Sequence, residues 1–327
     1  MPSGTIIKGI GGFYYVDING TVYECKARGV FRKNGITPLV GDKVVIEIND
    51  DEKKLGFVTE ILERETELIR PSVANVNQLA AVIAVKSPAP DFLLLDKLLV
   101  TAAVKNIEAF ICINKIDLDT EGESADIAET YIRAGYKVIY LTSKSRTEDN
   151  SKNADINCIT ENNDIAENTA ANNSGFLTLR EMLEGRVTVF AGQSGVGKST
   201  ILNNIMDSMI MKTGDVSRKI ERGRHTTRHA ELLRMKTKGY VVDTPGFSSF
   251  ELADIKASEL YLYYKEFNTH FTGCRFNGCV HISEPGCSIK SAVEKGLINS
   301  GRYERYNILY NYLKENENNK YTKRTRT

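Results

Sequence analysis

The residues Gly192 to Ser199, G-Q-S-G-V-G-K-S, have the types and spacing needed to hold a phosphate group. They follow the apolar segment Val187–Ala191, which reads as a buried strand, and they open a predicted helix. Glycines let the backbone wrap an anion, helix N–H groups point at it, and Lys198 adds a positive charge. The pattern matches a P-loop at every specified position, with Ser199 as an oxygen ligand of Mg²⁺. We therefore predict a nucleotide site here.

A second motif, N-K-I-D at Asn114 to Asp117, follows the predicted strand Ala109–Ile113. The Asp117 carboxylate offers two acceptors, and the guanine edge presents two adjacent donors where adenine presents an acceptor. Lys115 would lie along the base, and Asn114 would tie this loop to the P-loop. Alone, such a motif is usually an ordinary polar loop, but beside a P-loop it favours GTP over ATP.

A third motif, D-T-P-G at Asp243 to Gly246, follows the predicted strand Tyr240–Val242. An aspartate at a strand end can hold Mg²⁺ through water, and a glycine N–H can meet the γ-phosphate, as a nucleotide-sensing switch requires. The segment between the P-loop and this motif contains R-G-R-H-T-T-R, where Thr226 or Thr227 could supply a further oxygen to Mg²⁺.

The order of these motifs is unusual, because the base-reading motif comes first and the P-loop second. Loops at one sheet edge can form the same site in either order, so a circular permutation preserves it. With this order the sequence resembles the ribosome small-subunit-dependent GTPase A (RsgA) family of circularly permuted GTPases. The resemblance covers nearly the whole chain and implies a GTPase that assists assembly of the small ribosomal subunit.

Hydrolysis needs a group that orients the attacking water. Ras-like GTPases use a glutamine directly after D-x-x-G, and Phe247 stands at that position here. We therefore expect slow intrinsic hydrolysis, with His225 as the candidate catalytic residue, as the resemblance also implies. A group delivered by the ribosome is the alternative, and His225 would then contact only RNA or solvent.

A cluster of metal-binding residue types, Cys274, Cys279, His281 and Cys287, lies near the C-terminus. Three thiolates and one imidazole make a closed tetrahedral zinc site, although C-x4-C-x-H-x5-C is not the ordinary finger spacing. The resemblance implies the same four ligands. A disulfide is the alternative, and His270 is a candidate spare ligand.

The elements that position these residues fall into three regions: residues 1–70, 71–250 and 251–327. The first has about five short strands, with Asn19-Gly20 as a hairpin turn, which predicts a small OB-like barrel or, alternatively, an SH3-like one. The second alternates strands with helices such as Asp91–Lys105, as in a parallel α/β sheet. We read residues 145–175 as a polar, mobile insertion. The fold class is thus multidomain α/β, with a barrel, a permuted GTPase domain and a helical zinc-binding domain.

Composition limits the remaining possibilities. The 327 residues carry a net charge of +1, and the longest apolar run, Leu79 to Val85, is far shorter than the roughly 20 residues of a membrane span. The N-terminus has no secretory pattern, so we expect a cytoplasmic protein. Between Lys212 and Lys238 there are nine bases and three acids, and the C-terminal tail is also basic. These stretches are compatible with RNA or with a solvated face.

The expected partners are GTP and GDP, Mg²⁺, one zinc ion and the small ribosomal subunit with its rRNA, for a chain that is a monomer. A GTP-dependent RNA-binding module with incidental hydrolysis is the alternative function, whereas a metabolic kinase would need neither the guanine reader nor D-T-P-G. The predicted GTP-binding residues are Asn114, Lys115, Ile116, Asp117, Ser143, Lys144, Gly192, Gln193, Ser194, Gly195, Val196, Gly197, Lys198, Ser199, Thr200, Asp243 and Gly246. The predicted magnesium ligands are Ser199, Thr226, Thr227 and Asp243.

Overall fold

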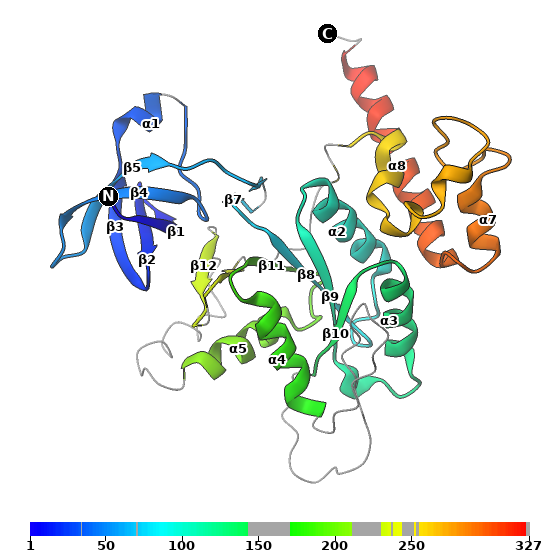
Figure 1. Ribbon diagram of the computed structural model, residues 1–327, viewed down its shortest axis with the longest axis horizontal. Helices are drawn as coiled ribbons and strands as arrows, with labels where there is room; N and C mark the ends of the chain where they lie inside the picture. Colours follow the sequence, from blue (N-terminus) through cyan, green and yellow to red (C-terminus); the bar gives the residue numbers. More distant parts are fainter. Residues whose placement is uncertain are drawn as a thin grey trace.

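The computed structural model describes residues 1–33, 35–69, 71–142, 171–210, 230–236, 238–243, 252 and 255–324. An N-terminal barrel lies at one end, a central sheet with helices follows, and a helical C-terminal part lies at the other end (Figure 1). Within these ranges, no helix combines the length and apolar character required to cross a bilayer.

The N-terminal strands close into a barrel in the order β1-β2-β3-β5-β4, which confirms the predicted five-stranded OB-like barrel. Asn19 and Gly20 both have positive φ, 51° and 97°, as the predicted two-residue hairpin turn requires. The barrel consists of β1 (Ser3–Ile10), β2 (Phe13–Ile18), β3 (Thr21–Ala27), α1 (Gly29–Lys33), β4 (Lys43–Asp50) and β5 (Leu55–Ile61).

A six-stranded sheet forms the centre of the molecule, in the order β10-β9-β8-β11-β13-β12. Its first five strands pair in parallel, as predicted, but the edge strand β12 pairs antiparallel with β13 and was not predicted. The strands are β8 (Gln78–Ala84), β9 (Glu108–Asn114), β10 (Lys137–Tyr140), β11 (Val187–Ala191), β12 (Glu231–Arg234) and β13 (Tyr240–Asp243), and the short pair β6 (Glu67–Leu68) and β7 (Val73–Ala74) connects the barrel to them.

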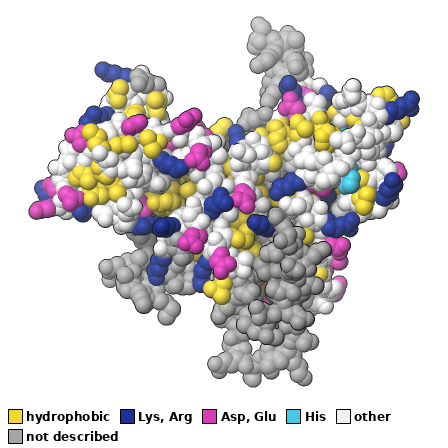
Figure 2. Space-filling view, in the orientation of Figure 1, with side chains coloured by type: hydrophobic (Ala, Val, Ile, Leu, Met, Phe, Trp, Pro, Cys, Tyr) yellow, Lys and Arg dark blue, Asp and Glu magenta, His cyan; other side chains and the backbone are white. Residues whose placement is uncertain are grey.

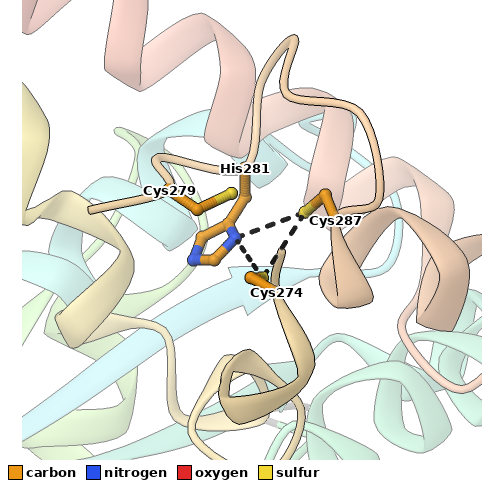
Figure 3. Close-up of side chains that lie close together, drawn as sticks. All are labelled: Cys274, Cys279, His281 and Cys287. Carbon is orange, nitrogen blue, oxygen red and sulfur yellow. Dashed lines mark hydrogen bonds between the residues drawn. The ribbon is translucent and has the colours of Figure 1, made fainter. Parts of the chain in front are cut away.

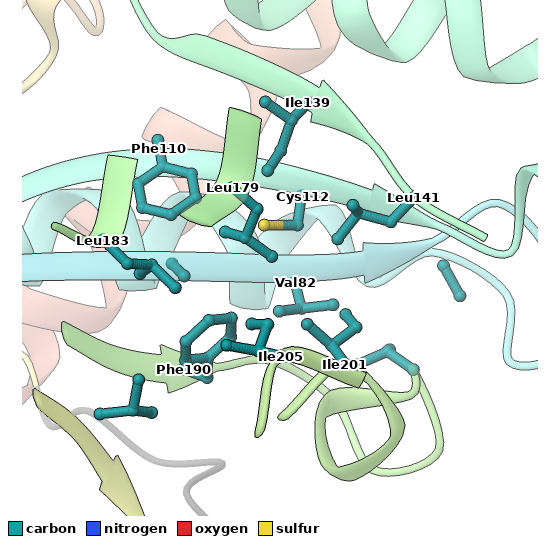
Figure 4. Packing of buried hydrophobic residues seen from close by; sticks show 14 of the residues in the cluster. Val82, Phe110, Cys112, Ile139, Leu141, Leu179, Leu183, Phe190, Ile201 and Ile205 are labelled. Carbon is teal, nitrogen blue, oxygen red and sulfur yellow. The ribbon is translucent and has the colours of Figure 1, made fainter. Parts of the chain in front are cut away.

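Helices cover both faces of this sheet, so its central strand β8 is buried at every position. On one face, Val82 and Phe110 pack against α4 (Ala171–Leu183) and α5 (Lys198–Ile210), as Figure 4 shows. On the other face lie α2 (Phe92–Val104) and α3 (Glu123–Arg133). The sheet therefore brings the ends of β9, β11 and β13 to one edge, where a ligand can reach them.

The predicted polar, mobile insertion, residues 145–175, lies outside the described residues up to residue 170, and the prediction is wrong for residues 171–175. Residues 171–175 belong to α4, whose Leu179 and Leu183 are fully buried against the sheet. A Cβ on Gly175 would lie 2.2 Å from the carbonyl oxygen of Tyr140, so this turn of the helix approaches β10 closely. Packing of the apolar face extends the helix back into a polar stretch, which is why composition alone was wrong there.

The C-terminal part is helical and has its own apolar core. It contains the 3₁₀ segments η2 (Ala257–Tyr263), η3 (Lys265–Phe267) and η4 (Phe271–Gly273), followed by α7 (Ser288–Glu294) and α8 (Ser300–Arg324). Leu252, Tyr264, Phe267 and Tyr306 are buried in this core together with Val100 of α2, which joins it to the sheet region.

A buried ionic network crosses the same junction. Asp96 of α2 is fully buried and accepts hydrogen bonds from Arg302 Nη1 (2.5 Å), Arg305 Nε (2.5 Å) and Tyr131 OH (2.9 Å). Arg302 Nε also donates to Glu266 Oε1 at 2.5 Å. On the molecular face shown in Figure 2, basic and acidic side chains are interspersed over the described residues. The charge on this face is therefore mixed rather than of one sign.

Candidate nucleotide site and metal site

The predicted phosphate loop lies between the end of β11 at Ala191 and the start of α5 at Lys198. Two of its glycines are required by close approaches. A Cβ on Gly192 would lie 2.1 Å from Val82 O, and a Cβ on Gly197 would lie 2.3 Å from Asn114 Nδ2. Any larger residue would push the loop away from β8 and β9.

The lysine of this loop is held by the loop itself. Lys198 Nζ donates to the carbonyl oxygens of Gly192 (2.7 Å) and Gln193 (2.9 Å). Partial burial lowers its pKa, because the charged ammonium is less well solvated there. Ser199 and Thr200 are exposed in the first turn of α5, and no acidic residue in this turn would repel an anion. The first N–H groups of a helix have no acceptor within the helix, so this N-terminus suits an anion.

The predicted base-reading loop is joined to the phosphate loop by hydrogen bonds. Asn114, at the end of β9, is fully buried and donates from Nδ2 to Val196 O at 2.8 Å, as expected from the sequence. Lys115 adopts a left-handed conformation with φ 61° and donates from Nζ to Gly195 O at 2.8 Å and to Ser87 O. Two segments about 80 residues apart in sequence thus form one surface.

Asp117 lies exposed in the 3₁₀ turn η1 (Ile116–Leu118) that follows Lys115. Its Oδ1 accepts a hydrogen bond from Thr142 Oγ1 at 2.9 Å, so the carboxylate is oriented from the neighbouring loop after β10. The carboxylate stays accessible, as a reader of the guanine edge must be.

Asp243 is the last residue of β13 and is exposed. Partial desolvation raises its pKa, and the nearby carboxylate of Glu231 adds to the effect. The predicted site residues Ser143, Lys144, His225, Thr226, Thr227 and Gly246 lie outside the described residues, and their roles stay predictions.

The four residues predicted as metal ligands converge in the C-terminal part (Figure 3). The ligand atoms of Cys274, Cys279, His281 and Cys287 all lie within 4.8 Å of one another, so the four could hold one metal ion. The three thiols are free, and no disulfide links them, which argues against the alternative reading. His270 is not part of this group.

The loop that carries His281 is held by two tyrosines of the long helix α8. The sequence analysis did not predict these contacts. Tyr303 OH donates to His281 O at 2.7 Å, and Tyr306 OH donates to Val280 O at 2.6 Å. Burial lowers the pKa of His281, which favours the neutral imidazole that a metal ion binds. The only sequence signal was the repeated tyrosine in α8, which reads equally well as ordinary core packing.

The sequence patterns of two families match this chain. The pattern described as RsgA GTPase matches residues 61–156 and 148–253, and the pattern described as RsgA N-terminal domain matches residues 3–58. The chain belongs to the RsgA GTPase family. It is therefore a GTP hydrolase with a circularly permuted GTPase fold.

Relatives agree over nearly the full length. The small ribosomal subunit biogenesis GTPase RsgA of Ruminiclostridium cellulolyticum is 52% identical over 317 residues, which cover 96% of this chain and 95% of the relative. The protein of the same name from Alkaliphilus metalliredigens is 43% identical over 97% of this chain and 99% of its own.

Two crystal structures are similar to the whole chain. The circularly permuted GTPase YloQ has 36% identity and a TM-score of 0.74, over 97% of this chain and 96% of its own. YjeQ from Thermotoga maritima has 33% identity and the same TM-score of 0.74, over 95% of this chain and 98% of its own.

Proposed function

We propose that this chain hydrolyses GTP on the small ribosomal subunit, assists late maturation of that subunit, and is released from it after hydrolysis. The observation that carries the proposal is the hydrogen bond from Asn114 Nδ2 to Val196 O, which joins a guanine-reading loop to a phosphate loop. It does so in a chain whose relatives bear the name small ribosomal subunit biogenesis GTPase.

In this proposal Asp117 accepts the two donors of the guanine edge, and Lys115 lies along the base. Lys198 leaves the carbonyl oxygens of its own loop and binds the β- and γ-phosphates. Ser199 and Asp243 hold Mg²⁺, directly and through water, with Thr226 or Thr227 as a further ligand. The remaining predicted contacts come from Ile116, Ser143, Lys144, Gln193, Ser194, Gly195, Val196, Gly197, Thr200 and Gly246.

The attacking water needs an orienting group, because Phe247 can neither donate nor accept a hydrogen bond there. We assign this role to His225, in the basic segment between the phosphate loop and β12. A ribosomal group is the competing assignment. Replacement of His225 separates the two, since only a catalytic His225 makes turnover on the subunit depend on it.

We assign zinc to the cysteine and histidine cluster because its geometry fits that ion. Zn–S bonds of about 2.3 Å and a Zn–N bond of about 2.0 Å give tetrahedron edges of about 3.8 Å between sulfurs and about 3.5 Å between sulfur and nitrogen. Cys274 Sγ lies 4.0 Å from Cys287 Sγ, and His281 Nδ1 lies 3.5 Å and 3.3 Å from these two sulfurs. We propose one structural zinc per chain.

The barrel, residues 1–70, and the zinc-binding part, residues 251–327, are the proposed contacts with rRNA, on either side of the GTPase region 71–250. The dense basic stretch from Lys212 to Lys238 supports a polyanion partner. We further propose that the protein acts as a monomer in the cytoplasm, where small subunits are assembled.

Steady-state GTP turnover with and without purified small subunits tests the proposal, with large subunits as the matched control. We expect small subunits, and not large ones, to stimulate hydrolysis. Nucleotide-dependent binding to the subunit without any stimulation would favour the RNA-binding module with incidental hydrolysis.

A further inference from the structure

The hairpin formed by β12 and β13 connects the two predicted nucleotide-sensing segments. β13 ends at Asp243, the first residue of D-T-P-G, and β12 begins at Glu231, three residues after the basic motif that ends at Arg228. Glu231 pairs directly with Asp243 across the hairpin. Any displacement of this hairpin therefore displaces Asp243.

One side of the hairpin is weakly supported by the sheet. Among the described residues, β13 pairs with β11 through Val187, Thr188 and Val189, and β12 is the edge strand. The barrel covers this edge: Figure 1 shows β12 beside the barrel. Ile7 of β1 and Val40 pack against the cluster that contains Leu232 of β12.

At the far end of the hairpin, Asp17 of the barrel holds both strands at once. Its Oδ2 accepts a hydrogen bond from Tyr240 OH at 2.7 Å and an ion pair from Arg234 Nε at 3.2 Å. Its Oδ1 accepts from Gly20 N at 2.7 Å, which anchors the carboxylate to the β2–β3 turn. The Asp17 side chain is 2% exposed, so these partners replace water around it.

Near the nucleotide end, a second contact holds the same hairpin. Lys8 Nζ of β1 lies 3.1 Å from Glu231 Oε2, and Glu231 is the cross-strand neighbour of Asp243. Both ends of the hairpin are thus attached to the barrel: one through Arg234 and Tyr240, the other through Glu231.

We propose that Asp17 and Lys8 are positioning residues for GTP hydrolysis, which act by attaching the β12–β13 hairpin to the barrel and so fixing Asp243 relative to the phosphate loop. The inference rests on the proposed role of Asp243 as a magnesium-site residue. The proposed contacts with guanine and with the β-phosphate come from the loops that follow β9 and β11, and these loops are not part of this attachment. Losing it should therefore slow hydrolysis without weakening nucleotide binding.

The test measures kcat and KM for intrinsic GTP hydrolysis by the full chain, together with the thermal midpoint of unfolding of each variant. Tyr240→Phe removes only the hydroxyl, which donates a hydrogen bond to Asp17 and also interacts with Thr5 of β1. The matched control is Tyr15→Phe, which removes a hydrogen bond to the carboxylate of Glu24 within the barrel. We expect kcat to fall roughly 2- to 30-fold in Tyr240→Phe, the range of couplings carried through packed networks, with KM within about twofold of the parent.

Two further variants examine the same attachment. Asp17→Asn should lower kcat at least as much as Tyr240→Phe, because it weakens the contacts to both Tyr240 and Arg234. Adding Tyr240→Phe to Asp17→Asn should lower kcat little further, because the two substitutions share the contact between these side chains. Lys8→Met should also lower kcat, compared with Lys43→Met, whose partner Glu65 lies outside the hairpin.

Unchanged kcat in both Tyr240→Phe and Asp17→Asn would overturn the proposal. A fall in kcat accompanied by a rise in KM and a fall in the thermal midpoint would also overturn it, because that combination indicates a merely structural contact. Because intrinsic turnover is measured, failure of small subunits to stimulate the parent would contradict the proposed function and leave this comparison intact.

Discussion

The junction between α2 and α8 makes a sharp prediction, because Arg302 is buried there with two carboxylates. Arg302 is 2% exposed, Asp96 is fully buried and Glu266 is 9% exposed. Arg302→Met keeps most of the side-chain volume but leaves Glu266 without its guanidinium and removes one of the three donors to Asp96. Removing one partner of a buried pair costs about 3–5 kcal/mol, so we expect a loss of that size in the free energy of unfolding.

Urea unfolding followed by far-UV circular dichroism measures this loss, and amide hydrogen exchange locates it in α8. Arg133→Met is the matched control, because Arg133 also bridges α3 to the C-terminal part through Gly296 O but is exposed. An exposed pair contributes about 0–1 kcal/mol. Adding Glu266→Gln to Arg302→Met should recover part of the loss, since a neutral amide tolerates burial better than a carboxylate.

Equal losses in Arg302→Met and Arg133→Met would refute this reasoning, as would a loss below about 1 kcal/mol for Arg302→Met. Either result would mean that Asp96 and Glu266 find other donors or water when the guanidinium is removed. The buried network would then not hold the C-terminal part against the sheet.

The remaining predictions concern the two candidate sites. Lys198→Ala should abolish most GTP affinity in fluorescent-nucleotide titration while circular dichroism stays unchanged; parental affinity would contradict the phosphate-loop assignment. Asp117→Asn should relax the preference for GTP over xanthosine triphosphate, by roughly 1–3 kcal/mol for a lost bidentate contact, and an unaltered preference would exclude Asp117 as the base reader. We expect native mass spectrometry to find one zinc in the parent, none in Cys287→Ser, and one in Cys25→Ser, whose substitution lies in the barrel; zinc retained in both variants would disprove the ligand set.

Elements with strong local signals could be predicted from the sequence. The Asn19-Gly20 turn needed positive φ at both positions, and the start of α2 needed a cap, which Asp91 provides by accepting from Leu94 N at 2.9 Å. The phosphate loop likewise follows from glycine spacing between a strand and a helix. In each case the cause lies within a few residues of the effect.

Contacts between distant segments could not be predicted, because each partner already had a local explanation. Asp17 stands in D-I-N-G and reads as a turn residue, yet its Oδ2 accepts a hydrogen bond from Tyr240, 223 positions away. Asp96 stands on an apolar helix as an apparent exposed acid, yet it is buried against Arg302, 206 positions away. The same limit applies to the edge strand β12, which is only four residues long and depends on β13 and the barrel.

The connection from the D-T-P-G motif to the C-terminal core leads to the last prediction. Eight residues separate Asp243 from Leu252, which is 4% exposed in the core with Tyr264 and Tyr306. If Gly246 binds the γ-phosphate as proposed, it does so six residues before Leu252 in the sequence. Nucleotide state should therefore bias the position of the C-terminal part.

By reciprocity, a small subunit that fixes the C-terminal part must favour one nucleotide state. We expect small-subunit binding to be roughly 5- to 150-fold tighter with a non-hydrolysable GTP analogue than with GDP, in co-sedimentation. Insertion of a short Gly-Ser segment after Glu251 lengthens the connection and should bring this ratio towards one, while the affinity for each free nucleotide stays at the parental value. Equal subunit affinity in both nucleotide states of the parent would exclude the coupling, because a ligand with no differential affinity cannot shift the equilibrium between the two arrangements.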